Sequence, residues 1–217
     1  MNIITNIIRN SVKIDFILLS EFEKKYVTLA YEMLQTTLGP DDIEDITSFR
    51  KSVSRSTDPD VEPKVICALV HNKLIGVLIG SFLRELNMGF ICYGAIEEKW
   101  RRNGVYSFMR SLIENLFVED AGNGKLEFII SEMSKYSVLY AKYVTGSTAF
   151  EVPCCYEQPG VQGLKTKPMA LVVQPICRCE LPGKDELINI INIIYNKIYR
   201  VSNVTDNSSF KRIVKSL

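Results

Sequence analysis

Apolar residues follow two patterns along the chain, and each pattern predicts one kind of element. Short runs rich in β-branched and aromatic residues, bounded by turn residues, predict β-strands. Segments whose apolar residues recur every three or four positions predict amphipathic helices. The predicted strands cover 12–19, 64–70, 74–83, 89–96, 126–130, 150–156 and 167–176. The predicted helices cover about 20–37, 41–51, 107–120, 135–144 and 185–201.

Turn and cap residues fall between these elements and support their boundaries. Ser20, followed three residues later by Glu23, forms a capping-box pattern at the start of the first helix. Gly-Pro at 39–40 ends that helix, and Ala-Gly-Asn-Gly at 121–124 ends the third one. His-Asn-Lys at 71–73 predicts a hairpin turn. This turn holds the only histidine of the chain, and a structural or exposed role is commoner there than catalysis.

Length and composition are those of one globular domain. The chain has 217 residues, of which 47% are hydrophobic and 24% are charged, which is enough for one sizeable core. We expect a single domain over 1–217, with its core over about 12–176 and an extra C-terminal helix over about 185–201. That helix could pack on the sheet or on a second subunit, so a homodimer stays open. The polar tail from Ser202 is expected to be loose.

Charge and cysteine usage argue against several classes of function. The 26 basic and 25 acidic residues leave a net charge of +1, which does not indicate nucleic acid or an anionic membrane as a partner. No apolar run approaches the roughly 20 residues of a membrane helix, and residues 1–9 lack the basic start of a signal peptide. The six cysteines show no metal-ligand spacing. We therefore expect no metal, and free thiols in a cytoplasmic protein.

One stretch, at 94–106, links a predicted strand to a predicted helix. It reads Gly-Ala-Ile-Glu-Glu-Lys-Trp-Arg-Arg-Asn-Gly-Val-Tyr. Backbone N–H groups of such a turn, followed by a helix N-terminus, can bind a phosphate, and glycine lets the backbone approach it closely. The stretch resembles the signature of the GNAT acyltransferases, the GCN5-related N-acetyltransferases. The residues that carry the resemblance are Ile96, Trp100, Arg101, Gly104 and Tyr106, with Tyr106 standing where the family has glycine or alanine.

The resemblance covers about residues 12–176 and implies a fold, a reaction and a cofactor. The implied fold is α+β in α/β/α layers, with helices flanking a mixed, mostly antiparallel central sheet. The implied enzyme is an N-acetyltransferase with acetyl-CoA as acyl donor, in which the primary amine of a small molecule or peptide attacks the thioester directly. The implied cofactor-binding residues are Gly94, Ile96, Arg101, Arg102, Asn103, Gly104, Val105 and Tyr106.

In this family resemblance, different residues would bind different parts of acetyl-CoA. Backbone groups at Gly94 and Ile96 would hold the pantetheine as an added strand would. The N–H groups of 102–106 would hold the pyrophosphate, and the backbone near Gly94 would stabilise the oxyanion. Read without the family pattern, the two arginines at 101 and 102 are a solvated charged turn.

Two residues are candidates for the proton transfers, since the amine must lose a proton and the thiolate must gain one. Tyr140 is the candidate donor, because Leu-Tyr-Ala-Lys at 139–142 resembles a family segment. Val144 and Met133 replace a glycine and an asparagine that are common there, and a core tyrosine is the other reading of Tyr140. Glu132 is the candidate base, because it follows a predicted central strand. Glu97 and Glu98 are the alternatives.

Two other functions stay open. The departures from the family pattern fit a non-catalytic CoA-binding or regulatory module of the same fold. An acyltransferase of this fold could also take its acyl group from an acyl-carrier protein. Cysteine nucleophilic catalysis is disfavoured, because one histidine in a distant turn would have to activate the thiol. The candidate thiols for that mechanism are Cys92, Cys154 and Cys155. The acceptor is expected to contact 38–63 and 150–168, which show no pattern that identifies it.

Overall fold

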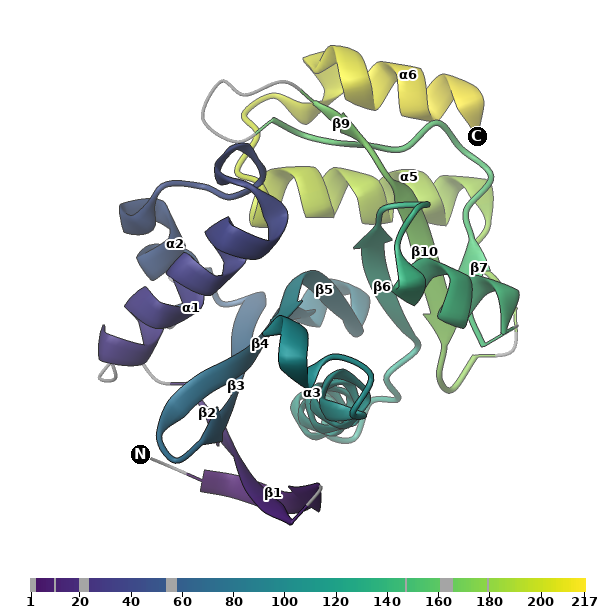
Figure 1. Ribbon diagram of the computed structural model, residues 1–217. Helices are drawn as coiled ribbons and strands as arrows, with labels where there is room; N and C mark the ends of the chain where they lie inside the picture. Colours follow the sequence, from purple (N-terminus) through teal and green to yellow (C-terminus); the bar gives the residue numbers. More distant parts are fainter. Residues whose placement is uncertain are drawn as a thin grey trace. The chain divides into compact units, whose positions relative to one another are not determined.

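The computed structural model describes residues 3–9, 11–19, 24–53, 58–146, 148–160, 166–178 and 180–217. Two compact units are distinguished within the chain, and each has its own strands and helices (Figure 1). The first unit comprises 1–84 and 89–124, and the second comprises 85–88 and 125–217. The predicted capping box at Ser20 and Glu23 lies outside the described residues. The expectation of a single domain stays a prediction.

Strands of the first unit lie next to one another in chain order. They are β1 (Ile3–Arg9), β2 (Val12–Leu18), β3 (Val61–Val70), β4 (Lys73–Leu83) and β5 (Met88–Ile96). The first four pair antiparallel with their neighbours. The β3–β4 turn has His71 and Asn72 at φ 48° and 62°, which is the left-handed geometry of a tight hairpin. The predicted hairpin is therefore confirmed.

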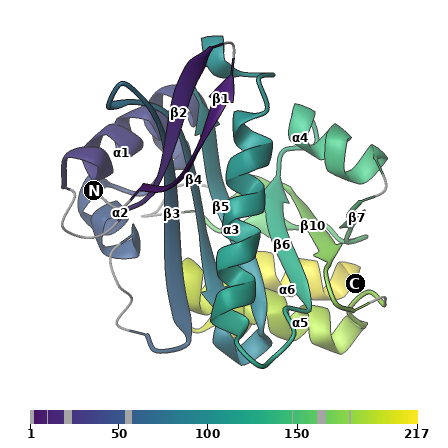
Figure 2. The same ribbon diagram turned by 90° about the horizontal axis from the view of Figure 1, so that it is seen from below.

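Helices cover both faces of this sheet. On one face lie α1 (Lys24–Leu38), the 3₁₀ turn η1 (Pro40–Asp42) and α2 (Ile46–Val53), and on the opposite face lies α3 (Val105–Ala121), as Figure 2 shows. Close packing of α3 requires a glycine on the sheet. A Cβ at Gly89 would lie 2.3 Å from the ring of Phe117 in α3.

The predicted helix over 41–51 begins later than expected, at Ile46. The chain turns once in η1, and α2 begins only after Asp45. The Asp45 carboxylate accepts hydrogen bonds from the backbone N–H groups of Thr47 and Ser48, at 2.7 and 3.1 Å. Asp45 is thus the cap, in place of Asp41 or Asp42, because its side chain satisfies the first free donors of the helix.

Three strands form the sheet of the second unit. The order is β6 (Phe128–Met133), β10 (Ala170–Pro175) and β7 (Phe150–Glu151), with antiparallel pairing. A separate ladder joins β8 (Glu157–Gln158) to β9 (Lys167–Pro168). Of the predicted strand 150–156 only the first two residues form a strand, β7, and β8 begins just after its predicted end. The predicted strand 167–176 is divided into β9 and β10.

Helices of the second unit include two that continue in π-helical turns. They are α4 (Val138–Tyr140) followed by η4 (Ala141–Thr145), α5 (Lys184–Ile193) followed by η6 (Ile194–Ile198), the 3₁₀ turn η7 (Val204–Asp206) and α6 (Ser208–Ser216). Two further 3₁₀ turns among the described residues are η2 (Arg84–Leu86) and η3 (Glu98–Trp100). None of the described helices is long and apolar enough to cross a membrane.

The expectation of a loose C-terminal tail is wrong, because that tail forms α6. The side chain of Asn207 accepts hydrogen bonds from the backbone N–H groups of Ser209 and Phe210, at 2.9 and 3.1 Å, and so caps the helix. The side chains of Phe210 and Ile213 are buried. A polar tail thus becomes a helix because one face of it carries apolar residues at helical spacing.

Candidate functional site

The chain between β5 and α3 folds into two successive turns. In the first turn, the N–H groups of Trp100 and Arg101 donate to the carbonyls of Glu97 and Glu98, at 2.8 and 3.1 Å. In the second turn, Arg102 and Gly104 have φ of 63° and 76°, and alternation of right- and left-handed residues points successive N–H groups to one side. We call residues 97–104 the β5–α3 loop.

Backbone donors at the end of this loop are available to a ligand. Within the described part of the chain, the N–H groups of Asn103, Gly104 and Val105 donate to no other group. Such donors at a helix N-terminus attract an anion, and the helix dipole adds to the attraction. The indole N–H of Trp100 is also buried and has no acceptor among the described residues.

A cation from outside the predicted motif also reaches the loop. A Cβ built on Gly104 would lie 3.5 Å from Nη2 of Arg9 and within 4.0 Å of its Cζ and Nε. Arg9 is exposed at the end of β1, and no described carboxylate forms an ion pair with it. The sequence interpretation missed Arg9, although the β-branched run at 3–9, followed by Asn-Ser and a second such run, is a hairpin signal.

Other predicted cofactor residues have local partners that explain their identity. Nε of Arg101 donates to the carbonyl of Ile96 at 3.0 Å, so this side chain ties the loop back to the end of β5. The Tyr106 ring packs over Gly94, where a Cβ would lie 3.0 Å from Cε2 of the ring. Tyrosine is therefore accommodated at the position of the small family residue because the strand beneath it carries glycine. Arg102 is exposed, and Asn103 is half-buried with its amide 3.4 Å from the carbonyl of Lys99.

Tyr140 lies in a small apolar cluster and its hydroxyl has a partner. The ring packs beside Met133, Ala170 and Val172. The hydroxyl donates to the carboxylate of Glu151, which also pairs with Nζ of Lys135 at 2.5 Å. The hydrogen bond to this carboxylate raises the pKa of Tyr140, so the phenol stays protonated at neutral pH.

Glu132 is buried and both of its carboxylate oxygens accept hydrogen bonds. It lies inside β6 rather than after the strand, with only 8% of its surface exposed. Tyr156 donates to Oε1 and Tyr199 donates to Oε2. Burial raises the pKa of the Glu132 carboxyl to about 7, although the two tyrosine hydroxyls act in the opposite direction. The carboxyl therefore exchanges its proton near neutral pH, as a general base must.

The two candidates for proton transfer lie on opposite faces of the second unit's sheet. Glu132 is paired across the ladder with Leu171, whereas Val172 is paired with Ser131 and with Glu151, the partner of Tyr140. Successive side chains of a strand point to opposite faces. The structure thus brings Tyr140 together with Glu151 and does not bring it together with Glu132.

Cys67, Cys92 and Cys154 are poor candidates for thiol chemistry. Cys67 is buried, and Cys92 is half-buried with Sγ 3.6 Å from the carbonyl of Ile79. Burial raises the pKa of the Cys154 thiol to about 11, so it is protonated at neutral pH and is a weak nucleophile. No group of three or more His, Cys, Asp or Glu residues that could hold a metal is found in the described ranges.

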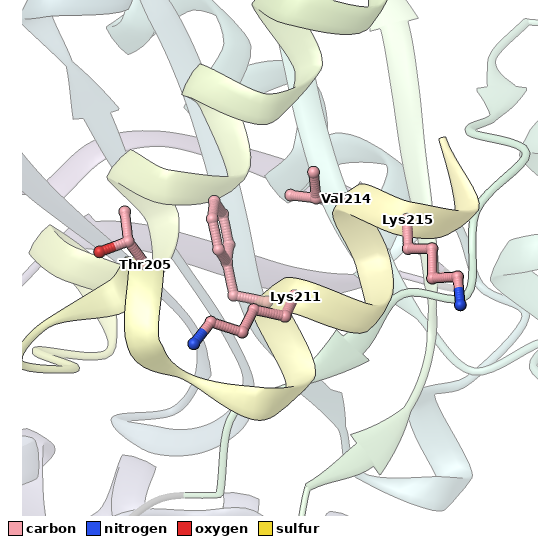
Figure 3. Close-up of a pocket in the computed structure, with 5 residues that line it drawn as sticks. Thr205, Lys211, Val214 and Lys215 are labelled. Atoms are coloured by element: carbon pink, nitrogen blue, oxygen red, sulfur yellow. The ribbon is translucent and has the colours of Figure 1, made fainter.

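A pocket lies beside α6 in the second unit. Its lining consists of Thr205, Phe210, Lys211, Val214 and Lys215, which Figure 3 draws as sticks. Lys211 forms an exposed ion pair with Asp206 at 3.5 Å. The lining holds no carboxylate and no phenol.

Comparison with solved structures identifies the fold. A GNAT-family protein from Bacteroides thetaiotaomicron superposes with a TM-score of 0.61 at 16% identity, over 86% of this chain and 99% of that chain. The diaminobutyrate acetyltransferase from Paenibacillus lautus was solved with L-2,4-diaminobutyric acid and coenzyme A. It gives a TM-score of 0.57 at 13% identity, over 79% of this chain and 99% of that chain.

A third structure leads to the same conclusion. The ribosomal-protein-S18-alanine N-acetyltransferase from Escherichia coli gives a TM-score of 0.54 at 10% identity, over 78% of this chain and 99% of that chain. No protein-family model and no curated protein matches the sequence. The predicted α+β, GNAT-like fold is therefore confirmed by structure.

Proposed function

We propose that this protein is an acyl-CoA-dependent N-acyltransferase that moves an acetyl group from acetyl-CoA to a primary amine of a small molecule or peptide. The observation that carries the proposal is the end of the β5–α3 loop and the start of α3. There the N–H groups of Asn103, Gly104 and Val105 have no partner among the described residues, Gly104 has φ 76°, and the guanidinium of Arg9 lies near the Cβ position of Gly104. The fold supports it, because the Paenibacillus lautus enzyme with this fold was solved with coenzyme A and an amine substrate.

Within this proposal the loop binds the phosphates of the donor. The N–H groups of Asn103, Gly104 and Val105 hold the pyrophosphate, and the helix dipole contributes about 0.3–1 kcal/mol at such a site. Arg9 adds a positive charge beside Gly104. Arg101 acts indirectly, because its side chain fixes the loop on the carbonyl of Ile96. Binding therefore depends more on backbone geometry than on the side chains of Arg102 and Asn103.

The proposal gives the two proton transfers to Glu132 and Tyr140. These residues lie on opposite faces of the second unit's sheet, so the proposal requires each group to reach the reacting centre from its own face. Glu132 accepts the proton of the amine, since burial brings its pKa to about 7. Tyr140 gives a proton to the leaving thiolate and must exchange Glu151 for sulfur to do so, because a phenol has one hydrogen. The raised pKa of Tyr140 keeps that hydrogen in place at neutral pH.

The proposal is tested by thiol release from acetyl-CoA. The purified protein is mixed with acetyl-CoA and a panel of primary amines that includes a short diamino acid, a polyamine and a peptide N-terminus. We expect release of CoA thiol that requires both protein and amine, with an amine product heavier by one acetyl group. In the same assay Y140F should lower kcat roughly a hundredfold, the lower range for loss of a proton donor. Acetyl-CoA binding without turnover for any amine would contradict the proposal.

A non-catalytic CoA-binding module is the second candidate. The observation in its favour is the hydrogen bond from Tyr140 to Glu151, which occupies the only hydrogen of the proposed donor. In such a module Y140F and the unmodified protein would bind acetyl-CoA equally, and neither would release thiol. The assay above distinguishes the two functions directly.

A further inference from the structure

The carboxylate of Glu132 is held from both ends within an apolar part of the second unit. Tyr156 donates to one oxygen and Tyr199 to the other. The neighbours of Glu132 on the same face of the sheet, Ile130 and Leu171, are fully buried. A carboxylate in such surroundings would be strongly disfavoured without hydrogen-bond donors. The two hydroxyls are therefore what permits an ionised Glu132.

The direction of these hydrogen bonds follows from a third residue. Nε2 of Gln158 donates to the hydroxyl oxygen of Tyr199 at 2.9 Å, and an amide N–H can only donate. The hydrogen of Tyr199 therefore points to Glu132. Gln158 lies in β8 and is itself buried, so the chain of donors ends on the carboxylate and fits its ionised form.

Other ionisable groups near this cluster have separate partners. Tyr195, which meets the ring of Tyr156 edge to face at 6.4 Å, donates its hydroxyl to the backbone carbonyl of Glu157. The side chain of Glu157 pairs with Ser209 and Arg212. Cys154 carries a protonated thiol. Among the described residues, these neighbouring ionisable side chains thus make no hydrogen bond to Glu132.

The residue that contacts Oε2 comes from the C-terminal part of the chain. Tyr199 follows η6, and its backbone N–H donates to the carbonyl of Ile194 at 3.1 Å, which fixes the tyrosine at the end of that helix. This segment lies beyond residues 12–176, the part that resembles the GNAT family in sequence. The C-terminal extension thereby contributes a polar contact to β6.

We infer that Tyr156 and Tyr199 are positioning residues that fix the orientation of the Glu132 carboxylate and hold it ionised, and that the C-terminal extension is needed for this. The inference rests on the proposed function only in so far as Glu132 is the base of that reaction. Each hydroxyl lowers the pKa of Glu132 against the effect of burial. Loss of either one must therefore raise it.

The test is a carbon NMR titration of the Glu132 carboxyl in the full chain, assigned with E132Q. We expect a midpoint near pH 7 in the unmodified protein, and a rise of about one unit in Y156F and in Y199F. The matched control is Y195F, which removes a hydroxyl from an equally buried neighbour that bonds the backbone instead. Its midpoint should stay within a few tenths of a unit of the unmodified protein.

Two results would overturn the inference. One is an unchanged Glu132 midpoint in both Y156F and Y199F. The other is an equal rise in Y195F, since this would assign the effect to a general loosening of the cluster. Y199F should disturb folding less than Y156F, because Tyr199 is half-buried whereas Tyr156 is almost fully buried.

Activity gives the readout that a purely structural role would not change. If the proposed function holds, kcat/KM falls on the acidic side of its pH profile with the same midpoint as the NMR titration of Glu132. That midpoint moves to higher pH in Y199F but not in Y195F. An acidic limb that stays in place while the NMR midpoint moves would overturn the role of these tyrosines toward the base. Complete absence of thiol release, with the NMR shifts present, would count against the proposed function and leave the positioning of Glu132 supported.

Discussion

The β5–α3 loop and the Glu132 cluster are built in contrasting ways. The loop offers backbone N–H groups from one stretch of sequence whose residues are exposed or half-buried, and its essential residue, Gly104, has no side chain. The cluster offers side chains from positions 132, 156, 158 and 199, and Glu132, Tyr156 and Gln158 are buried. A backbone site depends on local conformation, whereas a buried side-chain site depends on distant segments packing correctly. The two regions should therefore respond differently to substitution.

The largest expected effect is that of G104V on donor binding. Valine is strongly disfavoured at φ 76°, and its Cβ would meet the guanidinium of Arg9. We expect G104V to lose two of the three N–H contacts to the pyrophosphate. CoA binding, measured by isothermal titration, should then be roughly a thousandfold weaker.

The matched control for backbone strain is G122V. Gly122 has φ 57° at the other end of α3, with open space around its Cβ position. This variant should lose similar stability and bind CoA normally. Equal loss of CoA binding in both variants would show that the loop is not the phosphate site.

The second prediction concerns E132Q and pH. The carboxyl pKa is raised from 4.5 to about 7 in the folded state, so the folded state binds the proton more tightly. The contribution of Glu132 to stability is complete below about pH 4.5 and is lost as the pH rises to about 7. Relative to E132Q, the unmodified protein should lose roughly 3 kcal/mol over this window in denaturant unfolding. Parallel stability profiles for the two proteins would mean that Glu132 titrates normally.

A third prediction separates Arg9 from the backbone donors of the loop. R9Q removes one positive charge beside Gly104, so CoA should bind about tenfold more weakly. Pantetheine, which lacks the pyrophosphate, should bind R9Q and the unmodified protein equally. K13Q is the control, because Lys13 is a neighbouring cation that pairs with Asp15 at 2.8 Å. If R9Q weakened the binding of pantetheine as much as that of CoA, the substitution would have damaged β1 instead of removing a contact to the pyrophosphate.

The smallest expected effect is that of N207A on stability. The side chain of Asn207 satisfies two free N–H groups of α6, and loss of such a cap costs about 1 kcal/mol. Thermal unfolding should show a lower Tm, while CoA affinity should not change. A change in CoA affinity would mean that the loop is not independent of the C-terminal helices.

Local signals in the sequence account for the parts of the fold and site that could be predicted. The strand–turn–helix at 89–120 follows from periodicity and from Gly104, and its observed bounds differ by a few residues. Arg9 and α6 fall outside the predicted elements, although the β-branched run at 3–9 is a strand signal and residues 208–216 carry apolar residues at helical spacing. Asn207, placed just before Ser-Ser-Phe, is the local signal that could have identified α6.

Contacts between distant positions could not be predicted in this way. Glu132 was expected after its strand, yet it lies within β6, because the strand continues to Met133. Its partners Tyr156 and Tyr199 carry no pattern that relates them to position 132. The hydrogen bond of Tyr140 to Glu151 likewise depends on the pairing of β7 with β10. Such contacts arise from tertiary packing, which local propensity does not encode.

Isothermal titration with CoA and acetyl-CoA tests the central claim most directly. The unmodified protein is titrated with each ligand, and the titration is repeated with G104V and G122V. The account predicts saturable binding of both ligands at micromolar strength or better, lost in G104V and kept in G122V. Absence of saturable heat with either ligand in the unmodified protein would contradict the assignment of the β5–α3 loop, and with it the proposed acyl transfer from CoA.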